Sequence, residues 1–210
     1  MKKKFIQYSF YFCGIFILAL GVTLTLLSNL GTGGWDALTT NIAKLINIQV
    51  GTGTFILGVI LVFITSILNK KNPNLYALLV SYTTGIFINF WYYSFFKEII
   101  LKNFFIRLIV VYLGVFIIGI GCTMIFVTNF SKNHTEDFIF AIAKKANIIY
   151  KTAKVLMDIL ALLIALILGY LLNDFKNIGI GTILNTLCTG YIIHFLLPYM
   201  NKIYNKINKI

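Results

Sequence analysis

The chain has 210 residues, of which 59% are apolar and only 11% are charged, a balance outside the range of soluble domains. A helix that crosses a bilayer needs about 20 mainly apolar residues, so this length accommodates about six spans and excludes a soluble domain beside them. The formal net charge of +12 comes from 17 lysines and Arg107, scattered between apolar runs. This pattern excludes the contiguous basic surface of a nucleic-acid-binding protein.

The expected fold class is an all-α membrane protein that forms one polytopic domain over residues 1–210. Six apolar runs predict six transmembrane helices. They cover about Phe5 to Ser28, Thr52 to Leu68, Leu75 to Tyr93, Phe104 to Thr128, Ile148 to Leu172, and Ile178 to Met200.

The distribution of basic residues predicts the orientation of these spans. With the amino end in the cytoplasm, 13 basic residues lie inside and five lie outside, the latter being Lys44, Lys97, Lys102, Arg107 and Lys176. Basic residues gather on the cytoplasmic side of membrane proteins. We therefore expect both termini in the cytoplasm.

A duplicated plan is visible along the chain. Gly14 and Gly21 recur as Gly114 and Gly121, at an offset of 100 residues. Trp35-Asp36 matches Glu136-Asp137 at an offset of 101, and the order Ser81, Thr84, Gly85, Asn89 matches Thr186, Thr189, Gly190, His194 at 105. Repeats of about 5–95 and 104–200 would each hold three spans, and an odd number of spans inverts the second repeat.

Each repeat also has a short polar segment after its first span. In the first, Gly31 and Gly33 precede Trp35-Asp36, and a helix of roughly 15 residues follows that is too short to span. Such a helix is interfacial or re-entrant. Asp36 is interpreted either as a helix-start acid, favoured by the helix dipole, or as a solute or proton ligand, and Trp35 either as an interfacial anchor or as part of a site.

The second short segment has Asn133 and Glu136 at capping-box spacing. Helix capping explains most of it, and a metal site of His134 with Glu136 and Asp137 is the lesser interpretation. We expect no metal and no cofactor.

Asp158 is the most informative single residue, because it lies inside the fifth expected span, ~10 Å beyond Lys151 at the helical rise per residue. Acids inside a membrane are costly and tend to be functional. The structural interpretation is an ion pair with Lys154 at i−4. The sequence leaves both interpretations open, and it places Asp137 and His194 in the same cytoplasmic half.

Small and polar residues repeat every four positions in the third and sixth expected spans. Asn89 and His194 belong to these stripes, which predict either close helix packing or a cavity lining. Glycines expected to act as hinges or loop residues lie in the first short segment, at the starts of the second and sixth spans, and within the sixth span. Together with Thr182, the complete set is Gly31, Gly33, Gly51, Gly53, Gly179, Gly181, Thr182 and Gly190.

These motifs resemble the YczE/YyaS/YitT family of bacterial integral membrane proteins, over nearly the whole chain. The family pattern is a glycine-rich loop with Trp-Asp, a short helix, a Gly-Thr-rich span start, an intramembrane acid in the second half, and a closing GxGT…G signature. Gly34 and Tyr191 stand here where the family often has proline. The resemblance is closest to the YczE branch. It implies location in the plasma membrane of a bacterial cell and this architecture more than an activity.

The leading functional hypothesis is a transporter or permease for a small solute, whose partners are the lipid bilayer and that solute. The substrate-binding hypothesis names Trp35, Asp36, Asn89, Asp137, Asp158 and His194. One rival is the substrate-binding subunit of an energy-coupling transporter, and another is a non-transporting accessory or sensor protein. An enzyme is not expected, since no HExxH or nucleophile elbow occurs. Homo-oligomerisation is left open.

Overall fold

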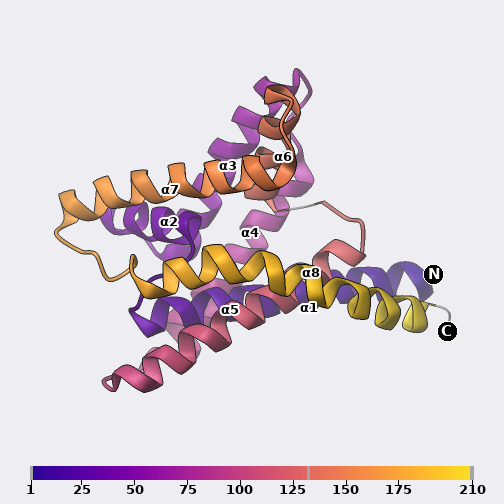
Figure 1. Ribbon diagram of the computed structural model, residues 1–210. Coiled ribbons are helices and arrows are strands. Elements are labelled where there is room, and N and C mark those ends of the chain that lie inside the picture. Colours follow the sequence, from indigo (N-terminus) through magenta and orange to yellow (C-terminus); the bar gives the residue numbers. More distant parts are fainter. Residues whose placement is uncertain (1, 132, 209–210) are drawn as a thin grey trace.

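The computed structural model describes residues 2–131 and 133–208, and within them all regular structure is helical. Eight α-helices and one π-helical segment follow one another along the chain (Figure 1). They are α1 (Lys2–Ser28), α2 (Gly34–Leu45), α3 (Val50–Asn69), α4 (Leu75–Asn89), η1 (Phe90–Phe95), α5 (Phe104–Val127), α6 (His134–Ala146), α7 (Tyr150–Leu172) and α8 (Ile180–Asn208).

Among the described residues, five helices are long and apolar enough to cross a membrane: α1, α3, α5, α7 and α8. The remaining expected span begins as α4, which has 15 residues, and continues directly into η1. Asn89 and Phe90 both have right-handed helical dihedrals, so the chain does not turn between the two segments. The prediction of an all-α membrane protein is confirmed, while the sixth span stays a prediction.

Asparagine ends most of these helices. Asparagine enters the left-handed region more readily than other residues with a side chain, because its short polar group bonds locally. Among the described residues, six residues other than glycine have a positive φ, between 48° and 55°, and each lies just beyond the end of a helix. They are Asn29, Asn47, Lys70, Asn129, Asn147 and Asn173.

The centre of the fold is a glycine-mediated crossing of α1 and α5. A Cβ atom added to Gly21 would lie 2.8 Å from the carbonyl oxygen of Gly114, and one added to Gly14 would lie 3.2 Å from that of Gly121. Small residues allow such close approach between membrane helices. Because residue numbers rise along α1 as they fall along α5, the two helices are antiparallel. The largest buried cluster, which includes Ile15, forms around this crossing.

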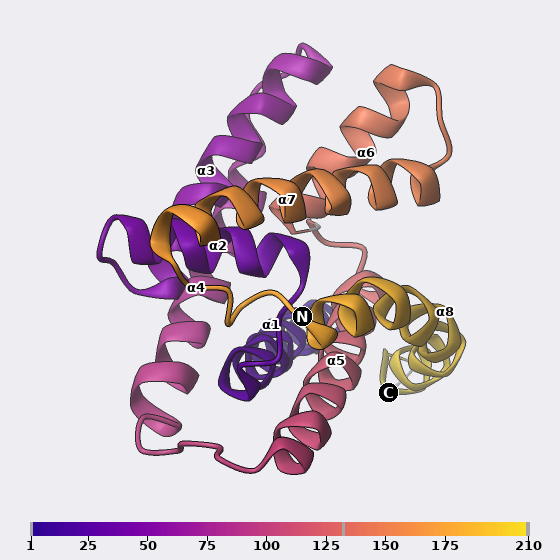
Figure 2. The same cartoon turned by 60° about the vertical axis from the view of Figure 1, so that its left-hand side comes forward.

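The short helices α2 and α6 lie between the long ones. α2 packs against α3 and α7, whereas α6 packs against α3 and α7 from the other end (Figure 2). At 12 and 13 residues, both are too short to span. The outward faces of α7 and α8 carry exposed large apolar side chains, as lipid contact requires.

The connections gather at two ends of the molecule. Both chain ends lie at one of them, called the terminal end (Figure 1). The α3–α4 turn at 70–74 lies on the same side, because Asn74 lines a cavity with Tyr8 and Tyr11 from the first part of α1. The connections 96–103 and 173–179 lie at the other, called the opposite end (Figure 1).

Candidate functional site

A cavity of about 120 Å³ lies where the first turns of α2 and α6 meet. Its polar lining comes from both short helices and from α7 and α8, and its apolar wall comes from α1 and α5. The charged groups that line it are Asp36, Glu136, Lys154 and Asp158.

Each short helix begins in the same way at this cavity. Gly33 caps α2, and its carbonyl accepts a hydrogen bond from the Ala37 amide at 2.8 Å. Asn133 caps α6, and its carbonyl accepts from the Asp137 amide at 3.0 Å. The third helical residue is an acid in both, Asp36 in α2 and Glu136 in α6. The expected match of Asp36 with Asp137 is therefore shifted by one residue.

The predicted capping box at Asn133 and Glu136 is wrong. The Asn133 side chain makes no capping hydrogen bond, and its Oδ1 atom is buried without a partner among the described residues. Glu136 turns instead to α7. Its Oε1 atom lies 3.3 Å from Lys154 Nζ, and its Oε2 atom accepts a short hydrogen bond from the Tyr150 hydroxyl.

Lys154 connects two of the acids. Its Nζ atom lies 3.3 Å from Glu136 and 3.7 Å from Asp158 Oδ2, so the expected i,i+4 pair exists inside a larger network. The Trp35 indole donates a hydrogen bond of 2.9 Å to Asp158 Oδ1 and so joins α2 to α7. Trp35 and Asp158, predicted separately from sequence, are therefore direct partners.

Asp36 is the exception in this network. Within the described part of the chain, its carboxylate has no hydrogen-bond or ion-pair partner. A Cβ atom added to Gly33 would lie 3.1 Å from Asp36 Oδ2 and 3.3 Å from Asn185 Nδ2, so the glycine leaves both groups accessible to the cavity. Burial raises the pKa of Asp36 to about 7, and the nearby Asp158 carboxylate adds to this effect.

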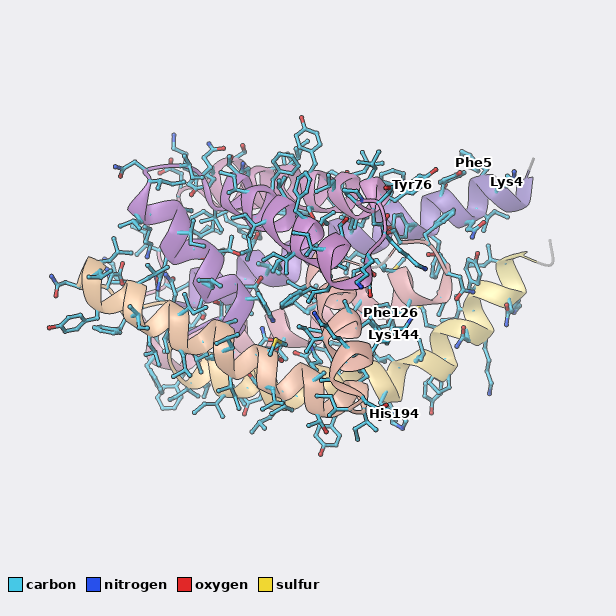
Figure 3. All side chains as sticks on the ribbon, turned by 90° about the horizontal axis from the view of Figure 1, so that it is seen from above. Lys4, Phe5, Tyr76, Phe126, Lys144 and His194 are labelled. Carbon is cyan, nitrogen blue, oxygen red and sulfur yellow. The ribbon has the colours of Figure 1, made fainter. Side chains whose placement is uncertain are left out.

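The other three predicted binding residues lie away from the cavity. Asn89 Oδ1 accepts a 2.8 Å hydrogen bond from the Gly51 amide and joins α4 to α3. Asp137 Oδ2 accepts one of 2.8 Å from Asn74 Nδ2 near the terminal end. His194 is exposed on α8 (Figure 3).

His134 also differs from its lesser interpretation as a metal ligand. Its ring is buried against Ser81 of α4, with Nδ1 2.5 Å from the serine Oγ. Burial lowers the pKa of His134 to about 3, so the ring is neutral at physiological pH. It serves to attach the start of α6 to α4.

The predicted hinge and loop glycines lie mostly against neighbouring backbone, and a hinge role for them stays a prediction. Gly31 alone among them has a positive φ, 107°, and it lies against Gly179 and Gly181 at the start of α8. Gly51 faces the Gly85 backbone so closely that an added Cβ would lie 1.9 Å from its oxygen. Gly53 packs on α2, Thr182 bonds to the Gly179 amide, and a Cβ on Gly190 would meet nothing within 4 Å.

Sequence reasoning missed Asn185 as a site residue and treated Glu136 and Lys154 as structural. Asn185 is a buried amide in α8, and its Nδ2 atom has no partner among the described residues. A polar residue inside a span is itself a functional signal, so Asn185 was detectable. Glu136 was detectable too, since it follows Asp36 by the same 100 residues that separate Gly14 from Gly114.

Comparisons with known proteins agree with the resemblance found in the sequence. Residues 5–198 match the model of a family of unknown function, DUF6198. The uncharacterized protein YyaS of Bacillus subtilis is 32% identical over 197 residues, covering 93% of this chain and 94% of the relative. The uncharacterized membrane protein YczE of the same organism is 30% identical over 207 residues, covering 98% and 92%. No solved structure matches. The chain therefore belongs to the DUF6198 family, together with relatives of the YyaS and YczE type.

Proposed function

We propose that the protein transports a small solute across the plasma membrane, and that the cavity between the first turns of α2 and α6 is its solute site. The observation that carries this proposal is the meeting of two non-spanning helices at one cavity with four ionisable groups. Buried ionisable groups inside a membrane are costly and mark solute or ion pathways. Interrupted helices whose ends point at a shared central site are typical of secondary transporters.

The proposal includes six spans arranged as two inverted repeats. The antiparallel crossing of α1 and α5 supports it, because its contacts come in pairs related by 100 residues. Gln7 Nε2 donates to the Thr128 carbonyl at 2.7 Å, and Arg107 Nε donates to the Ser28 carbonyl at 2.5 Å. Exchanging the two repeats converts one contact into the other.

The helix ends support the same relation. Ser28 and Thr128 each donate to the carbonyl three residues back, at 2.7 Å, and each hydroxyl accepts the amide two residues ahead. The left-handed residues Asn29 and Asn47 recur as Asn129 and Asn147.

The expected orientation becomes part of the proposal. Lys70 and Lys71 belong to the α3–α4 turn, which lies on the side of the terminal end, where both chain ends lie (Figure 1). Lys144, at the last turn of α6, lines the same cavity as Lys71. This grouping of basic residues favours a cytoplasmic terminal end.

Two surfaces related by the proposed repeat differ in a way that a transporter requires. At the opposite end, Asn41 of α2 is buried, donates to the Ala165 carbonyl at 2.8 Å and accepts from Asn177 Nδ2 at 2.9 Å. Close to it, Lys44 pairs with Asp174 at 2.8 Å. These contacts close α2 onto α7.

The related surface at the terminal end is open. A cavity of about 320 Å³ separates α3 from α6 there, and it is lined by Ala141 and Lys144, which stand 100 residues beyond Asn41 and Lys44. Lys144 lines this cavity together with Lys71, whereas Lys44, at the related position of α2, forms an ion pair with Asp174. We infer that the structure represents one of two states, with the opposite end closed.

Proteoliposomes test the proposal. Solutes that stabilise the purified protein in a thermal-shift panel should exchange across the bilayer in counterflow, because a ligand that binds only the folded state raises its stability. Replacement of Asp36 by Asn should reduce this exchange, whereas replacement of Glu98, an exposed acid in the 96–103 connection, by Gln should not.

Two results would contradict the proposal. Absence of both a stabilising solute and any flux would favour the accessory or sensor alternative, and co-purification with an ATPase module would favour the energy-coupling subunit. No catalytic step is assigned to these residues.

A further inference from the structure

The unpaired carboxylate of Asp36 carries an inference about the solute itself, which rests on the proposed solute site. Three carboxyl groups line the cavity against one ammonium group, and Lys154 already contacts Glu136 and Asp158. Asp158 has the Trp35 indole as a further partner. Asp36 is thus the one carboxylate lining this cavity that no cation contacts among the described residues.

Two amide side chains beside it independently indicate a ligand. Asn185 is only 9% exposed, and its Oδ1 accepts from Thr189 while its Nδ2 has no partner among the described residues. Asn133 Oδ1 on the facing helix is likewise buried without a partner there. A buried polar atom without a partner costs about 1–3 kcal/mol, so an occupied site would relieve both.

We propose that the solute is a small amine that also carries a hydroxyl or carbonyl oxygen, held by its ammonium group at Asp36. The ammonium gives Asp36 a cationic partner and has further N–H donors for Asn133 Oδ1. The oxygen accepts from Asn185 Nδ2. A cavity of about 120 Å³ limits the solute to a few non-hydrogen atoms, since a cavity of ~150 Å³ holds a molecule the size of benzene.

The same geometry makes a proton the competitor of the amine. With the amine absent, the Asp36 carboxylate has no cationic partner of its own, and protonation neutralises it. Binding then exchanges one for the other: the protonated carboxyl releases H⁺, and the carboxylate forms an ion pair with the ammonium. Because the two ligands exclude each other, each lowers the apparent affinity of the other equally. The transporter would accordingly exchange amine for proton.

Ethanolamine is the probe, with ethylene glycol as its neutral analogue and glycolate as its anionic analogue. Calorimetry on the full chain in detergent should show binding of ethanolamine alone. The affinity should fall by up to about tenfold for each pH unit below the titration of Asp36, with release of about one proton per amine bound.

Three variants assign the residues. Asp36→Asn should weaken binding by about ten- to a hundredfold, because a charge-assisted contact is lost. Asn185→Leu, which leaves the charges intact, should weaken it by about fivefold. Asp137→Asn, altered outside the cavity, should bind as the original chain does.

Tighter binding of glycolate, or no binding of ethanolamine, would overturn the inference, and flux of another solute would then leave the transporter proposal intact. Unchanged affinity in both Asp36→Asn and Asn185→Leu would also overturn it. Asp36-dependent binding of ethanolamine without flux in proteoliposomes would support the amine site and contradict transport.

Discussion

Replacing Asn41 by Ala should open the opposite end of the molecule. Asn41 is fully buried and makes two hydrogen bonds there, one to the Ala165 carbonyl and one from Asn177 Nδ2. In the proposed repeat, the residue that corresponds to Asn41 is an alanine, Ala141, which lines the cavity at the terminal end. The substitution therefore gives the closed end the chemistry of the open one.

The magnitude follows from the two bonds. While the end stays closed, truncation leaves the Asn177 amide without its partner, at a cost of about 1–3 kcal/mol. The Ala165 carbonyl loses only a second donor, because it keeps the hydrogen bond that it accepts within α7. Opening admits water, which gives the Asn177 amide a partner again. A net loss of about 2 kcal/mol in the closed state would raise the ratio of open to closed molecules about 30-fold.

Cysteine labelling measures this ratio. Thr40 is buried at the closed end, and Phe140, 100 residues later, lines the open cavity. A Thr40→Cys reporter, in a background without the three native cysteines, should react with an impermeant maleimide about 30 times faster once Asn41→Ala is added. Asn177→Ala, which removes only one of the two bonds, should give a smaller increase.

One result would refute this reasoning. If Asn41→Ala stays folded in thermal unfolding and the labelling rate of the reporter does not change, the buried Asn41 contacts do not hold the closed state. The two-state interpretation of the two ends would then lose its main support.

Three further outcomes are expected. Asp174→Asn breaks a partly exposed pair with Lys44, so it should speed labelling of the same reporter only about two- to fivefold, in line with ~0.2–1 kcal/mol for such pairs; a larger effect than that of Asn41→Ala would contradict the ranking. Gly51→Ala should lower the thermal midpoint strongly, because its Cβ would lie 1.9 Å from a carbonyl oxygen of α4, whereas Gly190→Ala meets nothing within 4 Å and should leave the midpoint nearly unchanged. Since the pKa of Asp36 in the folded state is raised from 3.8 to about 7, the folded state favours the protonated acid, and stability should fall as pH rises through this window. The thermal midpoint of Asp36→Asn, measured at pH 5 and pH 8, should lack that fall. An equal fall in both proteins would assign it to other groups.

The sequence alone determined the environment and the kind of fold. Runs of about 20 apolar residues have no stable alternative to membrane helices, so the spans at 5–28 and 104–128 could be located with errors of a few residues at most. The short polar segments that follow these two spans could be predicted as short helices, because they are too short to cross the membrane. Asp36, Trp35 and Asp158 were identifiable as exceptions within this pattern.

Only the tertiary structure decided which exceptions meet. Asp36 and Glu136 are 100 residues apart and face one cavity because α1 and α5 cross in antiparallel contact and bring the starts of α2 and α6 together. His194 is a residue type that often occurs in functional sites, but its position on α8 leaves it exposed on the outside of the molecule. Spacing along the chain fixes the face of a helix on which a side chain lies, but only packing fixes which neighbour that face meets, and so a sequence can name candidate charges without pairing them.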